Sequence, residues 1–159
     1  MQMKRGSWKP YVGFLILTEA VGGLAGWLTK KGVQAYGRVP KSKLTPPDAV
    51  FPVVWSALFA LMAIGAARVW RSPPSADRTR GLVLFACQLA ANFAWSLLFF
   101  NLQAFGFALI WLILLWILIL LMTLSFGKVD KTSAWLQVPY LAWVAFAGYL
   151  NGVTWFLNR

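Results

Sequence analysis

The side chains best suited to bind a ligand or to react are aromatic and polar residues that recur at helical spacing within long apolar runs. Because residues three and four apart share one face of a helix, each series forms a stripe. The two series are Gln88, Asn92 and Trp95, and Trp143, Ala147, Leu150 and Asn151. Together with Trp55 from a third apolar run, these stripes would line an interior cavity. Such a cavity would bind a flat, apolar molecule.

The same residues also have a purely structural interpretation. Amides inside a membrane commonly hydrogen-bond between helices, at about 0.6 kcal/mol each, and tryptophans commonly form belts at the membrane interface. On composition alone these are the commoner uses. The sequence therefore leaves a ligand cavity and a structural role open for the same side chains.

A basic loop broken by prolines leads directly into the apolar run that carries Trp55. Pro46 and Pro47 cannot lie inside a helix, since each lacks an N–H and clashes with the preceding turn. We expect Asp48 to cap the helix that follows, where an acid also suits the positive end of the helix dipole. The cations of this loop would form charge-assisted pairs with the anionic edge of a ligand. They are Arg38, Lys41 and Lys43.

Glu19 is the only acid inside an apolar run. A charged carboxylate at the centre of a bilayer costs about 3 kcal/mol or more. Glu19 must therefore be protonated, paired, or in a wet cavity. Two interpretations follow: a site that couples to protons or cations, or a protonated carboxyl group hydrogen-bonded to a neighbouring helix.

The composition of the chain indicates that its solvent is lipid. Of its 159 residues, 60% are hydrophobic and 12% are charged, whereas a soluble domain has about a quarter charged residues. The net charge of +11 is carried in loops and at the ends of apolar runs, so it predicts attraction to anionic lipid headgroups rather than to nucleic acid. We expect an integral, multi-pass membrane protein whose partners include membrane lipid and no nucleic acid.

Several kinds of catalytic and metal site are excluded by the same composition. The chain has no histidine and one cysteine, Cys87, which removes imidazole ligands, cysteine zinc sites and disulfide frameworks. Four acids leave little for catalysis by a carboxylate pair, and neither a Gly-rich phosphate loop nor a catalytic triad is present. We predict no catalytic residue, no metal and no required cofactor.

Five apolar runs are long enough to cross a bilayer core of about 30 Å, where their backbone must be helical. The runs are 10–28, 49–69, 81–100, 105–126 and 134–157, and the longest loop is 30–48. We predict an all-α bundle of five transmembrane helices in a single membrane domain over 1–159, with a kink at Pro139. The first run would alternatively be a cleaved signal peptide. The distribution of basic residues favours a cytoplasmic N-terminus.

Small residues recur every four positions in two of the runs. Gly22 and Gly26 form one pair, and Ala86, Ala90 and Ala94 form a stripe on the third run. Small residues at this spacing let two helices approach closely. The sequence leaves open whether these contacts lie inside the bundle or between protomers.

Three parts of the chain, in order, resemble the signature of one known family. They are Tyr36, Pro46-Pro47, Val50-Phe51-Pro52 and Trp55; then Gln88-Leu89, Asn92, Trp95 and Phe99-Phe100; and finally Pro139-Tyr140-Leu141, Trp143, Phe146-Ala147 and Leu150-Asn151. At this spacing, over roughly residues 10–157, the chain resembles the translocator protein family. This family is also called tryptophan-rich sensory protein (TspO/MBR) or peripheral-type benzodiazepine receptor.

The resemblance implies a five-helix bundle, often a homodimer, with a pocket open toward the first loop. Members of the family bind porphyrins such as protoporphyrin IX, some bind cholesterol or isoquinoline ligands, and several bacterial members degrade porphyrin in light. Carried over by position, Trp55 and Trp143 would flank the ligand, and the alanine-rich third helix would form the dimer contact. The other pocket residues would be Tyr36, Asn92, Trp95, Ala147 and Asn151.

The chain departs from the family's pattern at two places. Leu44 stands where the family usually has a loop tryptophan, so the contact of that tryptophan with the ligand is not carried over. Gly152 stands where mammalian members have the tyrosine of a cholesterol motif. Cholesterol binding is therefore not predicted.

The expected function is porphyrin binding, with light-dependent degradation or transport of the porphyrin and a regulatory or stress role. Without histidine the site lacks the usual axial ligand of haem, so free-base porphyrin is the expected ligand. The alternative is a small proton-coupled exporter built around Glu19, because an acid within the membrane permits such coupling. A third interpretation is a non-enzymatic stress or signalling partner.

Overall fold

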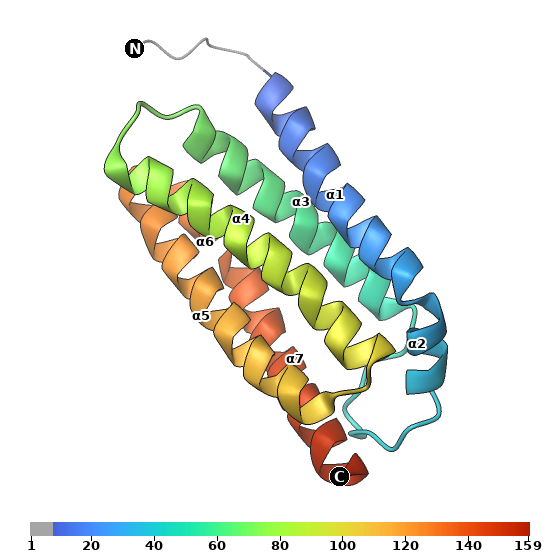
Figure 1. Ribbon diagram of the computed structural model, residues 1–159. Coiled ribbons are helices and arrows are strands. Elements are labelled where there is room, and N and C mark those ends of the chain that lie inside the picture. The colour runs from blue at the N-terminus through green and yellow to red at the C-terminus, as the bar shows by residue number, and fades with distance from the viewer. Residues whose placement is uncertain (1–7) are drawn as a thin grey trace.

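The computed structural model describes residues 8–159, and this part of the chain is helical, with no strand (Figure 1). Lys4 and Arg5, two of the residues that favoured a cytoplasmic N-terminus, lie outside the described range. The long helices are α1 (Lys9–Leu28), α3 (Val50–Trp70), α4 (Ala76–Ser96), α5 (Phe105–Val129) and α7 (Val138–Asn158). The shorter elements are α2 (Lys30–Tyr36), α6 (Lys131–Trp135) and a π-helical segment, η1 (Leu97–Asn101), that continues α4.

Four helices of the described range are long and apolar enough to cross a membrane: α1, α3, α4 together with η1, and α5. The predicted class, an all-helical membrane protein with several spans, agrees with this arrangement. α7 has 21 residues, but Asn151, Thr154 and Asn158 lower its apolar character. The count of five spans therefore stays a prediction.

The segment 30–48 begins with a helix, so its prediction as one continuous loop was wrong. Thr29 separates α1 from α2, with a backbone near φ −100°, ψ 7° and a hydroxyl group that donates to the Ala25 carbonyl at 2.7 Å. Gly32 lets α2 lie against η1, because a Cβ there would lie 2.5 Å from the carbonyl oxygen of Phe100. A helix of seven residues is not stable alone, and this supporting contact is not visible in the sequence.

α4 begins five residues before the apolar run that predicted it. The Ser75 side chain accepts a hydrogen bond from the backbone N–H of Arg78 at 3.0 Å, and Asp77 lies in the first turn, where it suits the helix dipole. This first turn is polar because it projects beyond the apolar part of the bundle. Hydropathy alone therefore placed the start of the helix too late.

The chain between α5 and α7 also differs from the prediction. A short helix, α6, is capped by Asp130, whose carboxylate accepts from the backbone N–H of Ser133 at 3.2 Å. Pro139 then occupies the first turn of α7, where its missing N–H has no partner to lose. Pro139 therefore starts a helix, and the predicted kink inside a longer helix was wrong.

Asp48 does not cap α3, contrary to the prediction. The residue before the helix is Ala49, and no side chain caps this end. The first backbone N–H, of Val50, instead donates to the carbonyl of Pro47 at 2.9 Å. The turn after the two prolines thus satisfies this donor, and the Asp48 carboxylate takes no part in capping α3.

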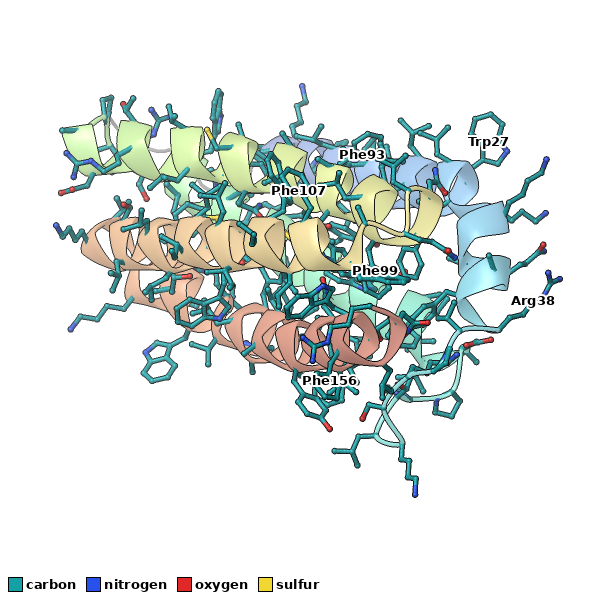
Figure 2. All side chains as sticks on the ribbon, turned by 60° about the horizontal axis from the view of Figure 1, so that its bottom comes forward. Trp27, Arg38, Phe93, Phe99, Phe107 and Phe156 are labelled. Carbon is teal, nitrogen blue, oxygen red and sulfur yellow. The ribbon has the colours of Figure 1, made fainter. Side chains whose placement is uncertain are left out.

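The core of the bundle forms around α5, which packs against α4, α6 and α7. Fully buried side chains there include Leu115, Ile119 and Tyr140. The outer faces of the helices are also apolar, as Ile110 illustrates with 67% of its surface exposed, and Trp27 projects away from the bundle (Figure 2). Apolar residues on both the inner and outer faces are what lipid as a solvent requires.

α1 is attached to the bundle chiefly through α3 (Figure 1). The Thr18 hydroxyl donates to the carbonyl oxygen of Phe59 at 2.9 Å. Gly22 lies against the ring of the same phenylalanine, since a Cβ at Gly22 would lie 2.5 Å from the ring carbon Cε2. Only 11% of the residues in the most apolar stretch of α1 are buried, against 33–39% of those in the other three candidate spans. α1 is thus the most loosely covered of these helices.

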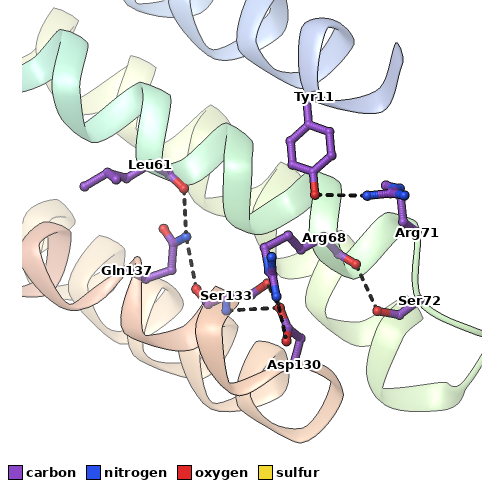
Figure 3. Close-up of polar contacts among 8 residues, drawn as sticks. All are labelled: Tyr11, Leu61, Arg68, Arg71, Ser72, Asp130, Ser133 and Gln137. Carbon is purple, nitrogen blue, oxygen red and sulfur yellow. Dashed lines mark hydrogen bonds and ion pairs between the residues drawn. The ribbon is translucent and has the colours of Figure 1, made fainter. Parts of the chain in front are cut away.

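Polar contacts tie the helices together at the end of the bundle where α3 ends (Figure 3). Arg68 Nε donates to Asp130 Oδ2 at 2.6 Å, and Tyr11 OH accepts from Arg71 Nη1 at 3.2 Å. Gln137 Nε2 donates to the Leu61 carbonyl at 3.2 Å. These bonds join α3 to α1, to the capping residue of α6, and to the residue that precedes α7.

Candidate functional site

A cavity of about 550 Å³ lies at the opposite end of the bundle, near α2 and the loop that follows it. Its walls come from α1, α3, α4 and α7, and α2 and η1 close one end. Cavities of this size are typical of sites for small organic molecules. Five of these six elements contribute aromatic side chains, whereas α1 contributes glycines, alanine and Glu19.

Three indoles from three different helices line this cavity: Trp55 of α3, Trp95 of α4 and Trp143 of α7. Trp95 stacks on Phe99, with ring centroids 5.2 Å apart and planes at 26°. The Trp143 ring meets Phe51 edge to face at 5.9 Å. Aromatic neighbours therefore hold these indoles in fixed orientations around one hollow.

The other tryptophans divide into two groups. Trp111 and Trp116 donate their indole N–H groups to the carbonyls of Ala91 and Leu141, at 2.8 and 3.1 Å. The rest are 41–72% exposed and face outward, as an interfacial belt requires. They are Trp8, Trp27, Trp70, Trp135 and Trp155. The cavity and the belt thus use different tryptophans, which the sequence alone did not separate.

The cavity-lining amides are hydrogen-bonded to neighbouring helices. Asn92 Nδ2 donates to the Tyr140 hydroxyl at 2.7 Å, and this hydroxyl donates to Gln88 Oε1, also at 2.7 Å. Trp95 Nε1 donates to Asn151 Oδ1 at 3.1 Å. The structural interpretation of the amides is therefore correct, and it holds together with a position on the cavity wall. These bonds fix the α4–α7 wall.

All seven residues predicted to line a pocket border this one cavity. They are Tyr36, Trp55, Asn92, Trp95, Trp143, Ala147 and Asn151. Binding of a ligand by these residues stays a prediction, because their common position defines a cavity and not the ligand.

The three loop cations predicted to pair with a ligand's carboxylates do not line the cavity. Lys41 Nζ donates to the carbonyls of Tyr36 and Val39 at 2.9 and 3.2 Å, and it lies 4.7 Å from the centre of the Tyr36 ring. Arg38 points away from the bundle (Figure 2), and Lys43 is exposed. Lys41 therefore fastens the loop, and the other two stand outside the cavity.

Two further bonds hold the loop against α7. Asn158 Nδ2 donates to the carbonyl of Pro40 at 2.8 Å, and the hydroxyls of Ser42 and Tyr149 lie 3.1 Å apart. Leu44, at the position where the resemblance implied a loop tryptophan, is 65% exposed and does not line the cavity. The loop is thus anchored by polar contacts without an aromatic side chain reaching inward from that position.

The two charged residues that do line the cavity are both acids, Glu19 and Asp48. Glu19 is partly buried halfway along α1, and among residues 8–159 no hydrogen bond or ion pair engages its carboxylate. The interpretation of Glu19 as a carboxyl group bonded to a neighbouring helix is therefore not what the structure shows. Glu19 is part of the wall of the cavity.

Sequence reasoning missed most of the α1 wall. Gly22, Gly23 and Gly26 border the cavity, and a Cβ added at Gly26 would meet no atom within 4 Å. The predicted close approach of helices thus applies to Gly22 and not to Gly26, which leaves open space. The spacing of Glu19 and these glycines, at positions i, i+3, i+4 and i+7, was the available signal that they share a face.

The alanine stripe of α4 does not pack inside the bundle. Ala86 and Ala90 are exposed on its outer face, beside the exposed Cys87. An intramolecular role for this stripe is therefore wrong for these two alanines. A contact between protomers at this face stays a prediction.

Comparison with known proteins supports the resemblance noted in the sequence. The model of the TspO/MBR family matches residues 14–156. The chain is 43% identical to a tryptophan-rich protein TspO of Chlorobaculum tepidum over 73% of this chain and 74% of the relative. It is 34% identical to a translocator protein of Bos taurus, over 96% and 92% of the two chains. It is 38% identical to protein CrtK of Rhodobacter capsulatus, over 77% and 78%.

The family match covers every residue that lines the cavity, from Glu19 to Asn151. The match and the relatives agree with the membrane-spanning helices found in the structure. The chain therefore belongs to the TspO/MBR family.

Proposed function

We propose that this protein binds planar tetrapyrroles, with free-base porphyrin as the ligand, in the indole-lined cavity. The observation that carries the proposal is the convergence of Trp55, Trp95 and Trp143, from three helices, on one cavity of about 550 Å³. Indoles offer large, flat, apolar faces at a small cost in conformational entropy. A macrocycle lying against them would replace lipid or water with aromatic contacts.

The proposal includes α7 as a fifth membrane span. α7 supplies Trp143, Ala147 and Asn151 to the same cavity as the four candidate spans, and its 21 residues are enough to cross the hydrocarbon core. Its polar residues Asn151 and Thr154 are fully buried, so they do not face lipid. Five spans place the two ends of the chain on opposite sides of the membrane.

The charges around the cavity orient the proposed ligand. A porphyrin's propionates would remain at the loop, where Arg38 and Lys43 lie outside the cavity, because the charged lining residues are acids. The apolar macrocycle would extend inward between the indoles. Any light-dependent degradation would use the photochemistry of the pigment itself, with Trp55 and Trp143 supplying contact; transport and a regulatory role would follow from the same binding event.

Binding is tested by titrating protoporphyrin IX with detergent-solubilised protein and following the shift of its Soret band. The double variant Trp55→Ala plus Trp143→Ala is expected to bind at least about tenfold more weakly, because two aromatic contacts are lost. The matched control is Trp27→Ala plus Trp135→Ala, which removes two indoles that are each 72% exposed on the outside. Equal affinities of the two double variants would refute the cavity as the binding site.

Glu19 supports a second candidate function, a small proton-coupled exporter. The observation in its favour is a carboxylate on the cavity wall, midway along a candidate span, without a partner among the described residues. Intramembrane acids of this kind commonly relay protons. If Glu19→Gln abolishes efflux of a substrate from proteoliposomes while porphyrin binding persists, the exporter function is supported.

A further inference from the structure

The charged groups around the cavity are separated by sign. Glu19 and Asp48 line it, whereas no lysine or arginine of the described residues does. Lys41 of the basic loop directs its ammonium group to two backbone carbonyls and to the ring of Tyr36. The ionisable side chains that line the cavity are therefore acids, in a chain whose net charge is +11.

The aromatic lining has the same electrostatic preference. The faces of indole, phenol and phenyl rings carry a negative quadrupole that attracts cations within about 6 Å of the ring centre. The aromatic lining includes Phe51, Trp55, Phe59, Trp95 and Trp143, whereas the ring of Tyr36 already has the Lys41 ammonium 4.7 Å from its centre. An acidic side chain that borders the same cavity as several aromatic rings is a combination that suits organic ammonium and other organic cations.

Glu19 is placed so that a ligand can reach it. It shares one face of α1 with Gly22, Gly23 and Gly26, which have no side chains to stand between the carboxylate and the cavity. In the described part of the chain no cation neutralises it. A charged carboxylate midway through a membrane span is costly without a counter-ion, so a bound cation would relieve that cost.

We propose that the cavity preferentially binds hydrophobic aromatic monocations, with the Glu19 carboxylate as their counter-ion and Trp55, Trp95 and Trp143 as the aromatic cage. This inference rests on the cavity of the proposed function and adds a preference for ligand charge. Asp48, at the loop end of the same cavity and exposed, contributes less because solvent screens it. A porphyrin would satisfy the same preference by keeping its carboxylates at the loop.

The test uses three probes whose planar tricyclic rings have the same shape but which differ in charge: 10-methylacridinium (+1), 9-methylanthracene (0) and 9-anthracenecarboxylate (−1). Binding is measured in a non-ionic detergent, so that the detergent adds no charge of its own. The wild-type protein is expected to bind the cation at least tenfold more tightly than the neutral ring, and the anion most weakly. Glu19→Gln is expected to lose the preference for the cation and to keep its affinity for the neutral ring.

The matched control is Asp77→Asn, which makes the same change in net charge at a position where the acid pairs with Arg80 outside the cavity. This variant is expected to keep the preference for the cation. Retention of the full preference in Glu19→Gln, or equal affinity of the wild type for all three probes, would overturn the inference. Unchanged binding of 9-methylanthracene shows that the variant is folded, and Glu19→Ala provides a second test of the same loss.

The outcomes also separate this inference from the proposed function. If protoporphyrin IX and the neutral ring bind but charge has no effect, only the charge preference fails. If no planar ring binds, or if Trp55→Ala plus Trp143→Ala leaves protoporphyrin IX and all three probes unaffected, the cavity itself is not the site and both proposals fail.

Discussion

The indole N–H of Trp95 donates a hydrogen bond to Asn151 Oδ1 at 3.1 Å and thereby joins α4 to α7 in the wall of the cavity. The Asn151 amide in turn donates to the carbonyl oxygen of Phe105 at 2.8 Å. One fully buried side chain therefore fixes both a cavity-lining indole and the first turn of α5.

Replacement of Asn151 by leucine is expected to destabilise the bundle. The Asn151→Leu variant leaves the Trp95 N–H and the Phe105 carbonyl without these partners, at a cost of about 1–2 kcal/mol. Thermal unfolding followed by circular dichroism in detergent measures the loss. Gln34→Leu, at an exposed position of α2, is the control and should unfold like the wild type. Identical unfolding of both variants would show that the Trp95–Asn151 contact does not support the wall.

A larger side chain at Gly26 is expected to block the cavity without disturbing the fold. A Cβ at Gly26 meets no atom within 4 Å, and Gly26 borders the cavity, so Gly26→Leu would extend into space that a ligand needs. Affinity for protoporphyrin IX should fall by about tenfold or more, as two to three displaced methylene-sized contacts imply. Gly13→Leu is the matched control, since Gly13 is also open on α1 but lies away from the cavity. Equal affinities of the two variants would contradict the position of the site.

Stability should fall at low pH through the ion pair of Arg68 and Asp130. The hydrogen bond from Arg68 is the main cause that lowers the pKa of Asp130 below its usual range. Because the folded pKa lies below the unfolded one, the pair stabilises the fold above the unfolded pKa, and this contribution is lost as the pH falls through the folded pKa. Both side chains are partly exposed, so the contribution is at most about 1 kcal/mol.

The measurement is the unfolding midpoint at pH 7 and pH 3 for the wild type and for Asp130→Asn. The asparagine keeps a side chain that can cap α6 but carries no charge. The variant should be less stable at pH 7 and should lose less stability between pH 7 and pH 3 than the wild type. A pH dependence that is the same in both proteins would exclude this ion pair as its source.

Removal of the Lys41 ammonium group should loosen the loop that follows α2. Lys41→Met loses two hydrogen bonds to backbone carbonyls and the contact with the Tyr36 ring. Trypsin should then cleave after Arg38 or Lys43 several-fold faster, since cleavage requires local opening of the backbone. Lys31→Met, at an exposed position of α2, should leave these cleavage rates unchanged. Equal rates in both variants would mean that Lys41 does not fasten the loop.

Much of the cavity could be predicted because its polar and aromatic residues are unusual within apolar, membrane-spanning runs. Tryptophans and amides at intervals of three and four within apolar runs mark a helix face that does not simply meet lipid, and all seven predicted residues border one cavity. The sequence could not show that Asn92 and Asn151 are occupied by bonds to other helices. Hydrogen-bond partners depend on which helices are neighbours, and hydropathy does not determine that.

The parts that sequence reasoning missed depend on contacts between distant segments. α2 is held by η1 through the close approach at Gly32, and a short polar helix of this kind has no periodic signal of its own. The role of Lys41 was assigned from its charge, whereas its position is set by carbonyls two and five residues away. The continuous apolar run 134–157 predicts a kink at Pro139. The structure instead ends α6 before Pro139, so that this proline lies in the first turn of α7.

The contact between α1 and α3 has a consequence for the route by which a ligand reaches the cavity. Thr18 and Gly22 hold this helix against Phe59, and most of its remaining surface faces outward. A hydrophobic molecule dissolved among acyl chains would thus reach the cavity past α1, whose lining residues include Glu19 and three glycines. Displacement of α1 alone would open a lateral path between the bilayer and the cavity, while the indoles of α3, α4 and α7 keep their positions.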